Sequence, residues 1–428
     1  HPPQWAAQQH PDQADASGAV VGHLRRRPLL GGGRHREQRG GHERQPRGDD
    51  RHRSYDPRID AVADIPISTW WPVGAVVGLL ALIAFVAAIR LRRLPRVLAI
   101  VLCVVLYAAE AASIVNAHFE YYRTVGEVFG ADGLDETTLA QAEQDLGTIP
   151  AQGKVVPLPI PATRSGFAAR TALAYLPPIW FARDRPALPV VMLLHGTPGA
   201  PTDWTDGGLA PATSDAWPAQ HGVTAPVLVM PDINGSLTGD SECVDSPRGN
   251  VETYLPGDRP AATVQTLGTL PPGPGWAVAG LSEGGTCSIM LALRHPEEFT
   301  TFGDSGGLAG PRVGETNADT ADTVTELFGG SQQAFLAHEP AALLTNGRFP
   351  GLGGWFQVGA DDDQPYQAIQ QLEPLARAAG VATCSVVMPG EGHTFVVWSA
   401  AFRDSLPFFA KRLRLPPDPA VNPEPCRE

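Results

Sequence analysis

A glycine-rich turn between an apolar strand and an apolar helix is the feature that most constrains this chain. Residues 276–281 predict a short buried strand, and residues 287–293 predict an apolar helix. The turn between them reads Gly-Leu-Ser-Glu-Gly at 280–284, which puts a glycine two residues to either side of Ser282. Glycines at these places let the backbone pass closely and raise the serine hydroxyl at the top of a sheet. The sequence therefore predicts that Ser282 is a nucleophile.

A second Gly-x-Ser-x-Gly match lies at 303–307, in a chain that holds 46 glycines. It also spells Gly-Asp-Ser-Gly-Gly, the serine-site string of trypsin-like proteases. Those enzymes need an upstream histidine and aspartate on a two-barrel β scaffold, whereas the segments upstream here alternate between strands and helices. We expect Ser305 to be a bystander in a glycine-rich loop.

Composition divides the 428 residues into segments. Residues 1–66 are rich in Arg, Gly, Gln, His and Pro, and we expect them to be disordered because they cannot bury enough apolar surface to offset the entropy of ordering. Residues 67–118 predict a transmembrane helical hairpin. Its first apolar run, 71–89, has no charge, and its second, 97–116, has one, Glu110. Each run can cross a hydrocarbon core of about 30 Å at about 1.5 Å per residue.

The connector at 90–96 holds four arginines, so the positive-inside rule places it in the cytoplasm and the rest of the chain outside. Aromatic pairs at 70–71 and 121–122 fit interfacial anchors, although arginines in the flanking segments count against this orientation. Glu110 is expected either to be a functional group or to lie neutral against a helix partner. The alternative to a membrane hairpin is a buried pair of helices in a soluble core.

Charge separates the remainder of the chain from nucleic-acid-binding proteins. Residues 119–428 contain 17 Lys and Arg against 35 Asp and Glu, a net charge of −18, and so acidic a domain is a poor ligand for nucleic acid. Beyond Cys103, which lies in the second apolar run, four cysteines could form two disulfides in three pairings. We favour Cys243 with Cys287, and Cys384 with Cys426.

After a linker at 119–152, residues 153–416 predict a catalytic domain, which a tail at 417–428 follows. Short apolar runs there are separated by loops and by helical patterns such as 367–379, which predicts an α/β-hydrolase fold with a mostly parallel central sheet and helices on both faces. Reactive groups should gather outside the carboxyl ends of its strands. The strand candidates are residues 155–159, 171–176, 190–194, 227–230, 276–281, 299–302, 355–358 and 383–387.

His393 follows the last strand candidate and lies 111 positions after Ser282. The hydrolase order Ser, Asp or Glu, His places the general base there. We therefore expect His393 to accept the serine proton.

A carboxylate is needed to orient that imidazole and to stabilise its protonated form. The strand at 355–358 is followed by three acids, among which a Gly-x-x-Asp spacing favours Asp362, with Asp361 second. Asp304, after the preceding strand candidate, is the outside choice. A cation site at 361–363 would need about six or more oxygen ligands, and no loop of that kind is visible.

The oxyanion of acyl transfer needs donors, which in this fold are backbone N–H groups after the nucleophile and after the third strand. We assign the N–H groups of Glu283 and Thr197. Pro198 has no N–H, so Thr197 is the available donor in the loop that begins at Gly196. The side chain at position 197 is expected to matter little.

With these residues placed, the domain resembles the esterase D and mycolyltransferase family of α/β hydrolases over about residues 150–415. Members of that family cleave simple esters or thioesters, or move acyl chains between trehalose lipids, and membrane-tethered relatives resemble hydrolases of aminoacyl-phosphatidylglycerol. Mycolyltransferases have Asp-Gly where this chain has His-Gly. The matching features are Leu-Leu-His-Gly at 193–196 followed by Asp203 and Trp204, Gly-Leu-Ser-Glu-Gly-Gly at 280–285, His295-Pro296 followed by Phe299, the run 359–362, and Gly392-His393.

The sequence thus predicts a membrane-anchored serine ester hydrolase or acyltransferase with a triad of Ser282, His393 and Asp362 and an acyl-enzyme intermediate. The resemblance and the tether imply an envelope ester, lipid-linked, as substrate. No metal or organic cofactor is expected, and the Gly-x-Gly-x-x-Gly dinucleotide fingerprint is missing after the early strands. The alternative from another class is a non-catalytic envelope protein that uses a hydrolase-like domain for binding or scaffolding.

Overall fold

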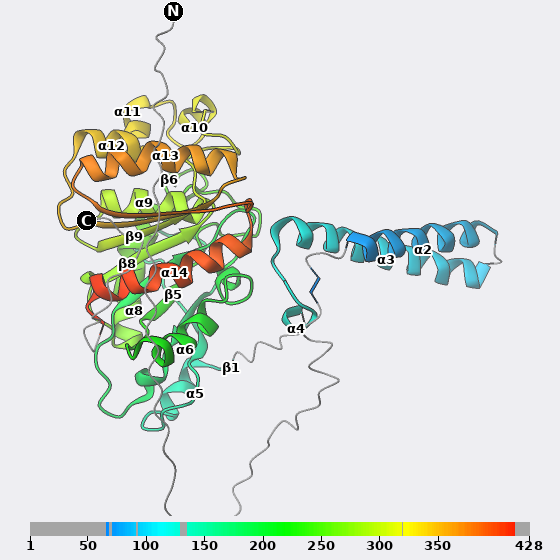
Figure 1. Ribbon diagram of the computed structural model, residues 1–428, viewed down its shortest axis with the longest axis horizontal. Helices are drawn as coiled ribbons and strands as arrows, with labels where there is room; N and C mark the ends of the chain where they lie inside the picture. The colour runs from blue at the N-terminus through cyan, green and yellow to red at the C-terminus, as the bar shows by residue number, and fades with distance from the viewer. Residues whose placement is uncertain (1–65, 68–70, 91–92, 129–134, 319, 416–428) are drawn as a thin grey trace, which may run out of the picture. The chain divides into compact units, whose positions relative to one another are not determined.

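The computed structural model describes residues 66–67, 71–90, 93–128, 135–318 and 320–415. Apart from residue 66, the predicted disordered tail lies outside this range, as does the C-terminal tail. The main feature is a sheet of nine strands in the order β1-β2-β3-β5-β4-β8-β9-β10-β11 (Figure 1). β3 runs antiparallel to both of its neighbours, whereas the other adjacent pairs are parallel. The predicted α/β-hydrolase architecture with a mostly parallel sheet is therefore confirmed.

Each of the eight strand candidates corresponds to a strand of this sheet. Four of them are shorter than the observed strands; in β8, β9 and β10 the strand continues through glycine and polar residues that the apolar pattern excludes, and β11 is longer by one residue at each end. Residues 303–305, predicted as a loop, belong to β9. The strands are β1 (Asp135–Glu136), β2 (Lys154–Leu158), β3 (Ala172–Leu176), β4 (Val190–Leu194), β5 (Val227–Met230), β8 (Gly273–Leu281), β9 (Phe299–Ser305), β10 (Gly353–Gly359), β11 (Ala382–Met388), and a separate hairpin of β6 (Asp245–Ser246) and β7 (Gly249–Asn250).

The two helices of the catalytic domain for which the sequence analysis gives bounds, 287–293 and 367–379, correspond to α9 and α13, and further helices lie between other strands. The predicted linker also contributes structure, because β1 within it pairs with β2 at the edge of the sheet. The helices are α2 (Trp71–Arg90), α3 (Arg93–Phe119), α4 (Val125–Val128), α5 (Leu139–Gln144), α6 (Ala210–His221), α7 (Val251–Thr253), α8 (Arg259–Leu267), α9 (Glu283–Arg294), α10 (Ala321–Glu326), α11 (Gln332–Leu336), α12 (Pro340–Asn346), α13 (Asp363–Ala378) and α14 (Phe395–Leu413).

Both faces of the sheet are covered, which explains why its central strands are continuous apolar runs. In β4 every residue is buried. Val190, Met192 and Leu194 point into the core that α9, α12 and α13 cover. Val191 and Leu193 point into the opposite core, beneath α6 and α14. The alternation fixes the register of the strand, and the loop after β4 consequently starts at a defined place on the sheet edge.

The two apolar runs near the start form helices α2 and α3, which pack against one another (Figure 1). Among the described residues, one segment, Arg96–Phe119, is long and apolar enough to cross a membrane, by length and composition only. Its mean hydropathy is 2.4, and 6% of its most apolar stretch is buried by the rest of the protein. The apolar part of α2, Gly74–Val86, is shorter. The predicted pair of spans is therefore not confirmed. The Glu110 carboxylate lies against α2, where a Cβ at Gly78 would come within 2.7 Å of its Oε1.

A disulfide joins Cys243 to Cys287, the first residue of the predicted apolar helix, with a Cα–Cα distance of 5.7 Å. This predicted pairing is confirmed. Cys384 is disulfide-bonded as well, and its predicted partner, Cys426, lies outside the described residues.

The disulfide between Cys243 and Cys287 should contribute strongly to stability. It closes a loop with a sequence separation of 44 residues, and the loss of chain entropy in the unfolded state corresponds to about 4 kcal/mol for a loop of that size. A Cys243→Ala/Cys287→Ala variant should unfold at a clearly lower urea concentration than the wild type, followed by the fluorescence of the buried tryptophans. An unchanged midpoint would show that the bond does not restrict the unfolded chain.

Candidate active site

Ser282 sits between the end of β8 and the start of α9 in a left-handed backbone conformation, with φ of 53° and ψ of −125°. Its N–H donates to the carbonyl of Ser305 at 2.9 Å. The flanking glycines are required, because a Cβ at Gly280 would lie 1.9 Å from the carbonyl oxygen of Gly284, and a Cβ at Gly284 would lie 2.3 Å from that of Leu194. This tight strand-to-helix turn is the geometry of a nucleophile elbow.

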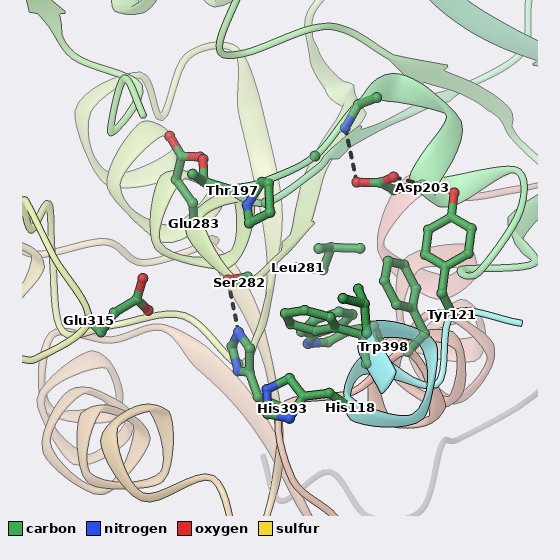
Figure 2. A pocket seen from close by; sticks show the side chains of 18 of the residues that line it. His118, Tyr121, Thr197, Asp203, Leu281, Ser282, Glu283, Glu315, His393 and Trp398 are labelled. Atoms are coloured by element: carbon green, nitrogen blue, oxygen red, sulfur yellow. Dashed lines mark hydrogen bonds between the residues drawn. The ribbon is translucent and has the colours of Figure 1, made fainter. Parts of the chain in front are cut away.

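The structure brings together the three side chains for which the sequence predicts a shared site. His393 Nε2 lies 2.9 Å from Ser282 Oγ (Figure 2), and His393 Nδ1 lies 2.6 Å from Asp362 Oδ2. The imidazole is partly exposed, at 32%, and the carboxylate is more enclosed, at 11%. Asp361 instead has an exposed side chain, and its N–H donates to the carbonyl of Glu391. The serine hydroxyl can therefore pass a proton to an imidazole that a carboxylate orients.

The two predicted oxyanion donors flank the same cavity as Ser282. Neither the N–H of Thr197 nor that of Glu283 donates a hydrogen bond to any residue that the structure describes. Glu283 is the first residue of α9, where backbone N–H groups have no partner within the helix. Both groups are thus available for an oxygen that becomes negative in the transition state.

The side chain of Thr197, which we expect to matter little, has hydrogen-bond partners that the sequence does not predict. Its hydroxyl lies 2.9 Å from the carbonyl of Gly239 and accepts from Asn234 Nδ2 at 2.6 Å. It also contacts the Glu283 carboxylate, which accepts from the same Asn234 amide at 2.7 Å. The side chain after the nucleophile thereby fastens the loop after β4. Sequence spacing could not reveal this, because Asn234 comes from a third loop.

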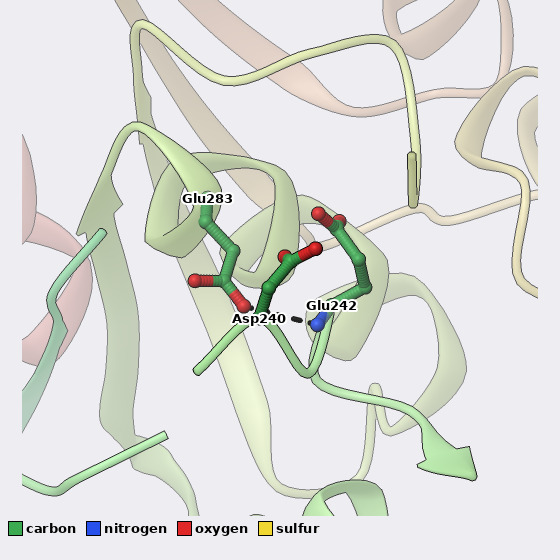
Figure 3. A group of neighbouring side chains, drawn as sticks. All are labelled: Asp240, Glu242 and Glu283. Atoms are coloured by element: carbon green, nitrogen blue, oxygen red, sulfur yellow. Dashed lines mark hydrogen bonds between the residues drawn. The ribbon is translucent and has the colours of Figure 1, made fainter. Parts of the chain in front are cut away.

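Glu283 also belongs to a cluster of three carboxyl groups with Asp240 and Glu242, whose oxygens lie within 4.8 Å of one another (Figure 3). Burial raises the pKa of Glu242 well above its usual range, and the nearby charges of Glu283 and Asp240 raise it further. Three oxygens are about half of the six to eight that Ca²⁺ takes. Because Glu283 Oε1 accepts from the N–H of Glu242 at 3.0 Å, we assign the cluster a positioning role.

A second buried network holds the loop after β4 from its other side. His195 is fully buried, with Nδ1 2.8 Å from the carbonyl of Gly196 and Nε2 3.1 Å from Asp232 Oδ1. Arg170 donates to Asp232 Oδ1 at 2.6 Å and to the carbonyl of Gly199 at 2.9 Å. Although burial opposes ionisation, the hydrogen bonds from His195 and Arg170 hold the pKa of Asp232 below its usual range. The motif Leu-Leu-His-Gly at 193–196 indicates the family but does not by itself predict this role of His195.

Ser282, His393 and Asp362 line a cavity of about 1420 Å³. Its walls include the catalytic candidates, the loop after β4, and Phe395 and Trp398 from α14. The C-terminal turns of α3 line it as well, from Ala111 to Phe119, which the sequence analysis treated as membrane span and linker only. No local pattern could have revealed that contribution, because it depends on the path of the chain after α3.

Comparisons with known proteins identify a family. The family model described as "Putative esterase" matches residues 168–409. A protein of Corynebacterium glutamicum, described as uncharacterized, is 32% identical over 323 residues, which cover 72% of this chain and 74% of that protein.

Two solved structures are also similar. A ferulic acid esterase superposes with a TM-score of 0.52 at 20% identity and covers 61% of this chain and 98% of its own. An S-formylglutathione hydrolase from Agrobacterium tumefaciens gives 0.48 at 18% identity, covering 57% and 90%. The resemblance inferred from the motifs is confirmed by the family model, and the chain belongs to this esterase family of α/β hydrolases.

Proposed function

We propose that this esterase is membrane-anchored and hydrolyses lipid-linked esters of the cell envelope through a triad of Ser282, His393 and Asp362. The observation that carries the proposal is the continuous relay from hydroxyl to imidazole to carboxylate, at 2.9 Å and 2.6 Å. It faces a large cavity in which two unused backbone N–H groups are available. A purely binding domain would have no need for this set of groups in one place.

In the proposed reaction, His393 Nε2 removes the Ser282 proton while Oγ attacks the ester carbonyl carbon. The carbonyl oxygen becomes negative and accepts hydrogen bonds from the N–H groups of Thr197 and Glu283. His393 then returns the proton to the leaving alcohol as the ester bond breaks, which leaves an acyl group on Ser282. Water, deprotonated by His393, attacks that acyl-enzyme and releases the acid. Asp362 stabilises the imidazolium at both stages.

Support for the membrane part of the proposal comes from α3. Its span of 24 residues corresponds to about 36 Å of helix, enough for a hydrocarbon core of about 30 Å. Tyr121 and Tyr122 follow the span, where aromatic residues favour the interface between lipid and water. A domain attached in this way meets membrane-resident esters at a high effective concentration.

The proposal predicts covalent labelling of Ser282. A fluorophosphonate probe should modify the wild-type protein and should not modify Ser282→Ala, because the probe requires an activated serine. Ser305→Ala is the matched control, since that serine lies in the other Gly-x-Ser-x-Gly match and should leave labelling intact. Gel fluorescence after labelling measures both. If well-folded wild-type protein stays unlabelled, the non-catalytic binding alternative is favoured instead.

Substitution of the two neighbouring aspartates should separate their roles. Asp362→Asn should lower kcat roughly 10³- to 10⁴-fold on a soluble ester, because an amide cannot stabilise the imidazolium as a carboxylate does. Asp361→Asn should stay close to wild type, because the Asp361 side chain is exposed and, within the described part of the chain, its hydrogen bond is made by the backbone N–H. Steady-state hydrolysis of p-nitrophenyl acetate provides the measurement. Comparable losses in the two variants would remove the basis for choosing Asp362.

Asp304, the outside choice for the acid, should affect stability instead of catalysis. It is fully buried, Oδ1 accepts from the N–H of Gly307, and Oδ2 has no partner among the described residues. Burial raises its pKa from 3.8 to about 7. The native state therefore holds this proton more tightly than the unfolded state, and stability falls as pH rises from about 4 to 7.

Asp304→Asn should remove this contribution, which is at most about 4 kcal/mol. Urea unfolding at pH values between 4 and 8 should show a shallower loss of stability in the variant than in the wild type, with kcat largely retained. If the free energy of unfolding changed with pH to the same extent in the wild type and the variant, Asp304 would not be the group that causes the loss of stability.

A further inference from the structure

The end of α3 forms one wall of the cavity that contains Ser282. Residues Ala111, Ala112, Val115 and Phe119 contribute apolar surface to this wall, and Leu281, Phe395 and Trp398 face the same cavity from the hydrolase domain. Of the three polar side chains on this stretch, His118 lines the cavity, and the other two bond to the backbone of α3 or of the segment after it. Ser113 donates to the carbonyl of Ala109 at 2.8 Å, and the Asn116 amide bonds both the N–H and the carbonyl of Tyr122. Apart from His118, the groups that this wall offers to the cavity are therefore apolar or already hydrogen-bonded.

Contacts just after α3 hold this wall against the catalytic domain. The Tyr121 hydroxyl lies 3.4 Å from Asp203 Oδ1 and 3.3 Å from Asp206 Oδ2, and Figure 2 shows its side chain directed toward Asp203. Arg123 donates to the carbonyl of Gly207 at 2.7 Å. The wall thus has side-chain and backbone attachments to the loop after β4.

Aromatic rings connect the same point to the catalytic histidine. The Tyr121 ring packs edge-on against Phe395, with centroids 4.6 Å apart, and Phe395 packs on Trp398 at 4.7 Å. Trp398 in turn packs on the His393 imidazole at 4.9 Å. The end of α3 and the catalytic candidates are thereby parts of one packed unit.

The size and polarity of the cavity indicate what it accepts. Its volume of about 1420 Å³ exceeds the range of roughly 300–1,000 Å³ that is typical of small-molecule sites. Carboxyl groups gather on its margin near Glu283, and the wall from Ala111 to Phe119 offers about 12 Å of helix, from eight rises of about 1.5 Å, along which Ala111, Ala112, Val115 and Phe119 present apolar surface. A hydrocarbon chain would lose little by leaving the bilayer for this wall, because the wall lies on the candidate span itself.

We propose that the C-terminal turns of α3 form a hydrocarbon-chain subsite, so that the substrates are esters with a long acyl or alkyl chain supplied by the bilayer. This inference rests on the proposed function. The ester carbonyl sits at Ser282 and the chain extends along Val115 and Ala112. α3 is then part of the substrate-binding site as well as an anchor.

The test uses the full-length protein in phosphatidylcholine vesicles, with p-nitrophenyl palmitate in the bilayer and p-nitrophenyl acetate in solution. Val115→Trp should fill the subsite and lower kcat/KM for the palmitate ester roughly tenfold or more. It should leave kcat/KM for the acetate ester within about twofold, since in the proposed pose a two-carbon acyl group stays at Ser282 and does not use the chain subsite. Ala112→Trp should act in the same direction.

Ile114→Trp is the matched control. Ile114 and Val115 are adjacent on α3 and similarly exposed, at 64% and 58%, but Val115 lines the cavity and Ile114 does not. The control should leave both rates unchanged. Equal effects of the Val115 and Ile114 variants, or an equal effect on both esters, would overturn the subsite while leaving the proposed function intact. Hydrolysis of neither ester by the wild type would overturn the proposed function itself.

Discussion

The candidate site depends on the direct backbone contact between the start of α9 and the ends of β4 and β8. Gly280 and Gly284 permit that contact, and any side chain there would collide with a carbonyl oxygen. Ser282 is held in a left-handed conformation, which costs of the order of 1–3 kcal/mol. Ile289, Met290 and Leu291 on the same helix are fully buried, and each contributes about 1.5–3 kcal/mol by burial. Packing of α9 thus exceeds the strain, and the strain persists because the helix cannot move without uncovering its apolar face.

Two networks of buried polar groups fix the position of the loop after β4, next to this contact. Asp232 with His195 and Arg170 holds one side of the loop after β4, and Glu283 with Asn234 and Thr197 holds the other. Such buried ionic groups contribute little net stability, because desolvation offsets most of their attraction. Their physical value lies in geometry, since a donor displaced by about 0.5 Å loses much of its effect on a transition state. Removing one member alone would leave a buried charge without its partner, at a cost of about 3–5 kcal/mol, so the loop depends on each network being complete.

Much of this arrangement could be predicted from local patterns, and the limits have physical causes. β8, α9 and Ser282 follow from one apolar strand, one apolar helix and two glycines, and the position of Asp362 follows from its spacing after β10. The role of the Thr197 side chain was missed because its partners come from loops distant in sequence. The glycine and polar composition of residues 303–305 predicts a loop. Pairing with β8 and β10 overrides that local preference and makes these residues part of β9. The cavity wall on α3 could not be predicted either, because a membrane span and an apolar binding surface have the same composition.

The negative charge of the catalytic domain gives a second reason for the proposed attachment through α3. Residues 119–428 carry a net charge of −18, and anionic lipid surfaces repel acidic proteins over about a Debye length, roughly 8 Å at physiological salt. Electrostatics would therefore not bring this domain to such a surface, in contrast to enzymes that bind through basic patches. In the proposed function, α3 as a covalent tether would overcome this repulsion without adding positive charge near the carboxyl groups of Glu283 and Glu242. Because the end of α3 lines the cavity, the proposed anchor and the proposed chain subsite would be formed by the same helix.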